Sequence, residues 1–139
     1  MNQTSTITLC SGKFLALVRE GRWEYVDRIG ATGAAIVFAV TDDQKLLLVE
    51  QYRIPVHART IELPAGIVGD QPGGLGESPT AAAKRELLEE TGYAADRVEA
   101  LTTGPASSGL TSEGDLAAGF GSAARKCRRW CCSRGYHRA

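Results

Sequence analysis

Three carboxylates crowd into five positions of the segment "KRELLEETGY", residues 84–93: Glu86, Glu89 and Glu90. On an α-helix each residue advances by about 100°, so these side chains fall within roughly one 100° arc, and Glu86 and Glu90 stack as i,i+4 neighbours. Like charges at this spacing destabilise a helix. A divalent cation reverses the effect, because hard ions such as Mg²⁺ take oxygen ligands and bind between carboxylates and phosphates. The segment predicts either a hydrated acidic face or a metal site.

The residues on either side predict the helix that must carry these carboxylates. Ser78 suits the N-cap, and Pro79 suits the first helical position. Gly92 suits the left-handed residue that ends a helix. We therefore expect a helix over residues 79–91, preceded by a glycine-rich loop in "QPGGLGE".

Hydrophobic runs and turn residues predict the strands around this helix. The continuous run 33–40 suits a strand buried on both faces, and "TDDQ" turns the chain so that residues 45–53 return as its hairpin partner. The remaining predicted strands are the pair 13–21 and 23–29, two short strands on either side of the Pro-Ala-Gly corner in "TIELPAGIVGD", and residues 96–101. Residues 104–113 are predicted as a loop.

Length and composition predict one globular domain. The chain has 139 residues, of which 43% are hydrophobic and 23% charged. No apolar run reaches membrane-spanning length, and the first residues lack the features of a signal peptide, so we expect a cytoplasmic protein without a membrane partner. The zero net charge divides unevenly, because the first 124 residues carry 10 of the 16 basic and all 16 acidic residues, a net charge of −6.

The acidic segment resembles the Nudix box, the signature of the Nudix hydrolases. Seven residues separate Glu77 from Arg85-Glu86-Leu87, and Glu89-Glu90 and Gly92-Tyr93 follow at the spacing of the box. Ten residues separate Gly66 from Glu77 where the pattern has five, which indicates a five-residue insertion around "DQPGG". The segments "LLLVEQYRIPV", "IELPAG" and "GPASSGLTSE" are similar to those of ADP-ribose pyrophosphatases, so the likeness spans roughly residues 30–113.

The resemblance implies a Mg²⁺ site, with Mn²⁺ as a possible substitute. It implies that Glu86 and Glu90 bind metal, that Glu89 is a further ligand or orients water, and that the backbone carbonyl of Ala65 completes the site. Arg85 joins the catalytic set by pairing with a box glutamate and fixing its rotamer. Glu77 is expected to brace the helix through such a pair.

The same resemblance suggests residues that bind substrate. Gln51 and Arg53 end a predicted strand where polar side chains face the nucleotide in the family, and surface polarity is the alternative explanation. Glu62 lies beside the "LPAG" corner. The remaining candidates lie in the loop that approaches the diphosphate and terminal ribose: Ser108, Thr111 and Glu113.

The implied fold is a Nudix α/β/α sandwich with a mixed β-sheet, in residues 1–113, with the box at about 66–93. The implied function is Mg²⁺-dependent cleavage of the diphosphate in a nucleoside diphosphate sugar, with ADP-ribose giving AMP and ribose 5-phosphate. Relatives usually dimerise, so a homodimer is expected. The alternative is a catalytically silent nucleotide-binding domain, with a basic tail that contacts RNA.

Residues 114–139 form a basic tail in which the resemblance stops, so the family's last strands and closing helix are expected to be missing or altered. Three explanations stay open: zinc bound by Cys127, Cys131, Cys132 and His137, nucleic acid contacts, or a shifted reading frame. Nucleic acid is an unfavoured partner, and a nucleoside diphosphate sugar is the favoured one. Translating the codons of residues 134–139 one nucleotide later permits Glu-Asp-Ile-Thr-Val-His, which resembles the segment carrying the family's catalytic glutamate. We therefore favour the frameshift.

Overall fold

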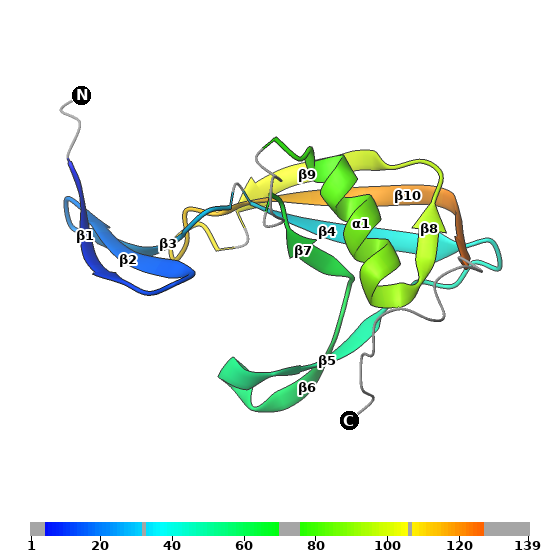
Figure 1. Ribbon diagram of the computed structural model, residues 1–139, viewed down its shortest axis with the longest axis horizontal. Helices are drawn as coiled ribbons and strands as arrows, with labels where there is room; N and C mark the ends of the chain where they lie inside the picture. The colour runs from blue at the N-terminus through cyan, green and yellow to red at the C-terminus, as the bar shows by residue number, and fades with distance from the viewer. Residues whose placement is uncertain (1–4, 32, 70–75, 106, 127–139) are drawn as a thin grey trace.

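The computed structural model describes residues 5–31, 33–69, 76–105 and 107–126, with side chains as far as Gly114. Within these ranges, one helix packs on a five-stranded sheet, a three-stranded sheet lies at one end of it, and a two-stranded hairpin projects from the body (Figure 1). No helix in the described ranges is long and apolar enough to cross a bilayer.

The elements follow one another along the chain with short connections. The strands are β1 (Thr6–Ser11), β2 (Leu15–Glu20), β3 (Trp23–Arg28), β4 (Ala34–Thr41), β5 (Val49–Arg53), β6 (Ala58–Glu62), β7 (Ala65–Ile67), β8 (Tyr93–Ala95), β9 (Glu99–Pro105) and β10 (Gly114–Lys126). A 3-10 turn, η1 (Ile54–Val56), joins β5 to β6, and the α-helix of the described residues is α1 (Pro79–Thr91).

The five-stranded sheet is mixed, as predicted. Its order is β7-β4-β10-β8, with β9 paired along β10. β4 runs antiparallel to β7 and parallel to β10, where Ala34 lies opposite Asp115 and Ala39 opposite Phe120. β10 therefore joins β4 to the strands on the other side of the sheet.

The core lies between β4 and α1, which crosses one face of the sheet (Figure 1). Alternate residues of β4 are buried, and they pack with apolar residues of α1 and with Val68. Phe38, on the other face of β4, is 45% exposed. The expected burial of this strand on both faces is therefore wrong, because the described residues supply one helical layer of the predicted α/β/α sandwich.

The helix begins and ends where the sequence predicts. Ser78 Oγ accepts a hydrogen bond from the backbone N–H of Ala81 at 3.2 Å, and Pro79 occupies the first turn. Gly92 is left-handed, with φ of 73°, and its N–H donates to the carbonyl of Leu88. These caps satisfy backbone groups that the helix leaves unpaired at its ends.

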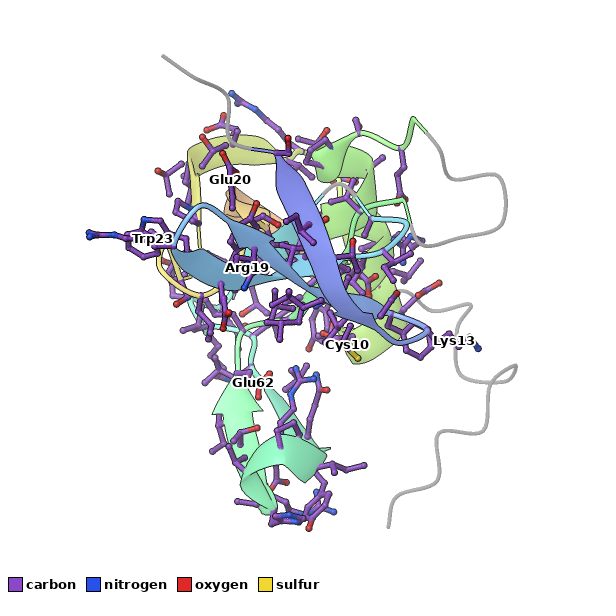
Figure 2. All side chains as sticks on the ribbon, turned by 90° about the vertical axis from the view of Figure 1, so that its left-hand side faces the viewer. Cys10, Lys13, Arg19, Glu20, Trp23 and Glu62 are labelled. Atoms are coloured by element: carbon purple, nitrogen blue, oxygen red, sulfur yellow. The ribbon has the colours of Figure 1, made fainter. Side chains whose placement is uncertain are left out.

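The predicted hairpin of residues 33–40 with 45–53 is wrong beyond its first residues. The returning chain pairs with β4 next to the turn, at the bridge between Val40 and Leu46. Backbone hydrogen bonds also run from Leu47 to Ala39 and from Thr41 to Lys45. From Val49 onward it pairs with β6 instead. The β5–β6 hairpin stands away from the body in both views (Figures 1 and 2).

The predicted strand pair at the N-terminus is confirmed, and β1 adds a third strand that the sequence did not predict. This sheet is tied to the loop that follows β9. The backbone N–H of Val26 donates to Leu110, and the N–H of Ser112 donates to Val26. The predicted strand 96–101 is shifted, since β8 and β9 leave residues 96–98 between them.

The resemblance implied that the family's last strands are missing or altered, and a strand does follow Glu113, because residues 114–126 form β10. Their small, glycine-rich sequence has no alternating pattern, so their pairing depends on neighbours distant in the chain. The proposed cysteine and histidine ligands, Cys127, Cys131, Cys132 and His137, lie outside the described residues.

A chain that stops at Glu113 should therefore lose cooperative unfolding. Without β10, β4 loses its parallel neighbour, and β8 and β9 lose the strand with which they pair. Thermal denaturation followed by circular dichroism measures this, with a chain ending at Lys126 as the control that keeps β10. A cooperative transition in the shorter chain would contradict the central position of this strand.

Candidate active site

The acidic face of α1 is partly enclosed by protein. Glu86 is 9% exposed, and Glu89 and Glu90 are half-buried. Burial raises the pKa of Glu86, Arg85 opposes this, and the negative charges of Glu89 and Glu90 add to it. Burial also raises the pKa of Glu90. A buried carboxylate that resists ionisation gains most from a nearby positive charge.

Arg85 provides one positive charge inside this face. Its Nη1 donates to Glu86 Oε1 at 2.6 Å and lies 3.6 Å from Glu89 Oε2. Its Nη2 donates to the backbone carbonyl of Ile67 at 3.0 Å. The guanidinium therefore joins two of the carboxylates to β7, as expected of a residue that fixes their rotamers.

Glu77 completes this network from the residue before the helix N-cap. Both of its oxygens accept hydrogen bonds from Arg85, at 3.0 and 3.1 Å, and the N–H of Gly69 donates to Glu77 Oε2. The Arg85 guanidinium lowers the pKa of Glu77, and Glu77 in turn raises the pKa of Arg85. The predicted bracing pair is present.

Glu90 is held from two other directions. The backbone N–H of Ala65 donates to Glu90 Oε2 at 3.0 Å, and the side-chain amide of Gln51 donates to Glu90 Oε1 at 3.0 Å. The first contact comes from β7 and the second from β5. Ala65, which the resemblance suggested as a carbonyl ligand, therefore lies beside this carboxylate.

Gly66 allows the backbone of β7 to approach the helix closely. A Cβ atom at this position would lie 1.9 Å from Glu86 Cδ and 2.0 Å from Glu86 Oε1. Its φ is outside the left-handed region, so the constraint is space and not backbone conformation. The glycine predicted to open the box thus makes the cradle in which the Glu86 carboxylate lies.

Arg53 and Glu62 pair across the β5–β6 hairpin. Arg53 Nη2 donates to Glu62 Oε2 at 2.5 Å, and Thr60 Oγ1 donates to Glu62 Oε1. The Arg53 guanidinium is the main cause that lowers the pKa of Glu62 to about 2. Glu62 lies at the base of the hairpin, where it joins the body (Figure 2). Arg53 lies two residues from Gln51 on the same face of β5, and Gln51 contacts Glu90, so this pair lies beside the acidic face.

The loop residues proposed for substrate lie against the N-terminal sheet. Ser108 and Thr111 line an open pocket of about 520 Å³ together with Trp23 and Tyr25. Figure 1 shows this loop at the β3 end of the molecule, whereas α1 crosses the five-stranded sheet. The structure therefore separates these two residues from the carboxylates of α1.

Glu113 accepts a hydrogen bond at 2.5 Å from Arg28 Nε, in an ion pair between the loop and β3. No sequence pattern indicated Arg28 as its partner. The carbonyl of Ile67 and the N–H of Gly69, which hold Arg85 and Glu77, were likewise missed. Backbone groups leave no side-chain signal in a sequence, so only the folded arrangement reveals them.

The donor types fit a hard divalent cation, although the side chains do not converge on one point. Among the described residues, no three His, Cys, Asp or Glu side chains are close enough together to hold a metal as they stand. Glu86 and Glu89 form ion pairs with Arg85, whereas Glu90 accepts hydrogen bonds from Ala65 and Gln51. The set nonetheless supplies three carboxylates, one of them buried in the Gly66 cradle, and oxygen donors of this kind suit Mg²⁺ or Mn²⁺.

Replacing Gly66 with alanine should lower the free energy of unfolding by about 1–3 kcal/mol, because the added methyl group displaces the Glu86 carboxylate. Urea denaturation measures the change. Gly104→Ala is the matched control, since a Cβ atom there meets nothing within 4 Å. Equal stability of the two variants would show that the cradle does not constrain Glu86.

Known proteins share a domain with this chain. A family model of the NUDIX domain matches residues 31–115. The methanol dehydrogenase activator of Bacillus methanolicus and the ADP-ribose pyrophosphatase of Bacillus subtilis (strain 168) are each 41% identical to the chain over 81 residues. Each alignment covers 58% of this chain and 41% of the relative, so the chain spans less than half the length of these curated relatives.

A solved structure extends the likeness to the fold. The crystal structure of an ADP compounds hydrolase superposes with a TM-score of 0.69, at 18% identity, over 88% of this chain and 67% of the other. Identity at this level supports the fold alone. Since the NUDIX domain match covers more than half of the sequence and includes the whole acidic helix, the chain belongs to the Nudix family.

Proposed function

We propose that this protein is a Mg²⁺-dependent hydrolase that cleaves the diphosphate of a nucleoside diphosphate sugar, with ADP-ribose as the substrate and AMP and ribose 5-phosphate as products. The observation that carries the proposal is the set of three carboxylates on α1, held against β7 by Arg85, the Gly66 cradle and the N–H of Ala65. The similarity to an ADP-ribose pyrophosphatase supports the choice of substrate.

The reaction adds water across one bond of the diphosphate. The water oxygen bonds to one phosphorus, and the bridging oxygen leaves with the other phosphate. When bound, a divalent cation neutralises charge on the phosphate oxygens and lowers the pKa of its water. In this proposal Glu86, Glu90 and the carbonyl of Ala65 hold the cation, and Glu89 is a further ligand or orients the water. Arg85 keeps Glu86 and Glu89 in place through its contacts with both.

The hairpin beside α1 is proposed to contact the substrate near the carboxylates, and the pocket at the N-terminal sheet is proposed as a separate surface for a base or a ribose. Arg53 and Glu62 form the polar side of the hairpin, where a guanidinium suits a phosphate, and Gln51 joins this side to Glu90. Ser108 and Thr111 line the pocket with Trp23 and Tyr25, and aromatic rings beside hydroxyl groups suit a base or a ribose. Glu113 shapes this second surface through Arg28.

Residues 114–139 lower the turnover that we expect from this chain. A shifted reading frame after about this residue remains our preferred explanation of residues 114–139, and it would remove the segment that carries the family's catalytic glutamate. We therefore expect weak turnover from the chain as it stands. The second candidate function, a silent nucleotide-binding domain with a basic tail, follows from the same loss. The expected cytoplasmic location stays a prediction.

The deciding experiment measures AMP released from ADP-ribose by the full chain, with Mg²⁺ and with EDTA, beside the Glu90→Gln variant. Intact mass and a cooperative melt confirm the sample. Turnover that needs Mg²⁺ and falls at least about 100-fold in the variant is expected, since the variant loses a charged metal ligand. Turnover that Glu90→Gln leaves unchanged would contradict the proposed site. Nucleotide binding without any turnover would favour the silent domain.

We also propose that the chain forms a homodimer. Apolar side chains are exposed on η1 and on the side of the hairpin away from α1: Tyr52, Ile54, Val56 and Ile61. Ile61 is 73% exposed, and an isolated two-stranded hairpin is marginally stable in water, so a partner that covers this apolar side would stabilise it. Sedimentation equilibrium should give twice the 14.8 kDa chain mass. Ile61→Lys should shift the mass toward the monomer, whereas Leu101→Lys on β9 should not.

A further inference from the structure

Gln51 makes a contact that its predicted role does not explain. It lies on β5, opposite Thr60 of β6, and its Nε2 donates to Glu90 Oε1 at 3.0 Å. The resemblance assigned Gln51 to the substrate. In the structure its amide points to a carboxylate of the acidic helix instead.

The second oxygen of Glu90 is also held. It accepts the backbone N–H of Ala65 at 3.0 Å, so the carboxylate is fixed at both oxygens by groups from two different strands. An ionised carboxylate accepts hydrogen bonds and each oxygen has two lone-pair sites, so both oxygens keep a site for a cation. Donors arranged in this way orient a ligand without blocking it.

We propose that Gln51 is a positioning residue that orients the Glu90 carboxylate for the divalent cation. This rests on the proposed function, in which Glu90 is a metal ligand. The contact also joins the hairpin to the helix, although β5 and β6 otherwise stand away from the body (Figures 1 and 2). Loss of the amide should free one oxygen of Glu90 and weaken metal binding, and it should leave nucleotide affinity in the absence of metal unchanged.

The rival explanation makes the opposite prediction. If Gln51 contacts the nucleotide directly, its removal weakens nucleotide binding without metal and leaves metal binding by the free protein unchanged. The two affinities therefore separate a positioning residue from a substrate residue, and neither of them depends on turnover.

The experiment uses the full chain and two probes. Electron paramagnetic resonance of free Mn²⁺ measures metal affinity without nucleotide, and isothermal titration calorimetry measures AMP affinity in EDTA. Gln51→Met removes the donor and keeps the length of the side chain. Tyr52→Met is the matched control, since this neighbour points to the other side of the strand and is 57% exposed. Glu90→Gln reports on the metal site itself.

We expect Gln51→Met to weaken Mn²⁺ binding about tenfold or more, as for other groups that orient metal ligands, and to leave AMP affinity unchanged. Thermal melts establish that the variants are folded, and Gln51→Ala serves as a second variant without the donor.

Wild-type Mn²⁺ affinity in Gln51→Met would overturn the inference, as would an equal loss in Tyr52→Met. If Glu90→Gln loses Mn²⁺ and Gln51→Met does not, only this inference fails. If Glu90→Gln binds Mn²⁺ as the wild type does, the proposed metal site fails, and the role of Gln51 fails with it.

Discussion

The acidic face of α1 depends on the guanidinium of Arg85. Three carboxylates within five residues repel one another, and partial burial strengthens the repulsion. Arg85 offsets it by contacting Glu86 and Glu89, and Glu77 holds the guanidinium in place with both of its oxygens. The same guanidinium bonds the carbonyl of Ile67, so the helix and β7 are fixed relative to each other. The Gly66 cradle depends on this fixed position of β7 relative to the helix.

Local signals predicted the helix and most of the site, and long-range pairing limited the rest. Ser78, Pro79 and Gly92 determine the ends of α1 through contacts within a few residues, so the sequence was sufficient there. The hairpin prediction was wrong because an alternating strand such as β5 can pair with either neighbour, and alternation does not select between β4 and β6. β10 was missed because small residues and glycines carry no strand pattern.

The proposed site residues show the same contrast between local signals, which the sequence carries, and long-range packing, which it does not. The box side chains share one helix, so their spacing predicted a common face for Glu86, Glu89 and Glu90. It did not predict that Glu90 turns toward Ala65 and Gln51. Gln51 was found on the predicted strand, in the middle of β5 and not at its end, and its partner depends on where the hairpin packs, which the sequence does not encode locally. The position of the loop 107–113 is set by backbone hydrogen bonds to Val26 of β3. Its separation from α1 was therefore not predictable from the sequence either.

The position of β10 also affects how the chain folds during synthesis. β4 is made early, but its parallel partner is complete only once residues 115–120 have left the ribosome. Until then β4 has one long edge with unpaired backbone groups, and such edges recruit other strands. Contacts between residues so distant in sequence also form slowly, because a long loop must close first. The nascent chain therefore passes through an interval in which chaperones or aggregation compete for the unfinished sheet.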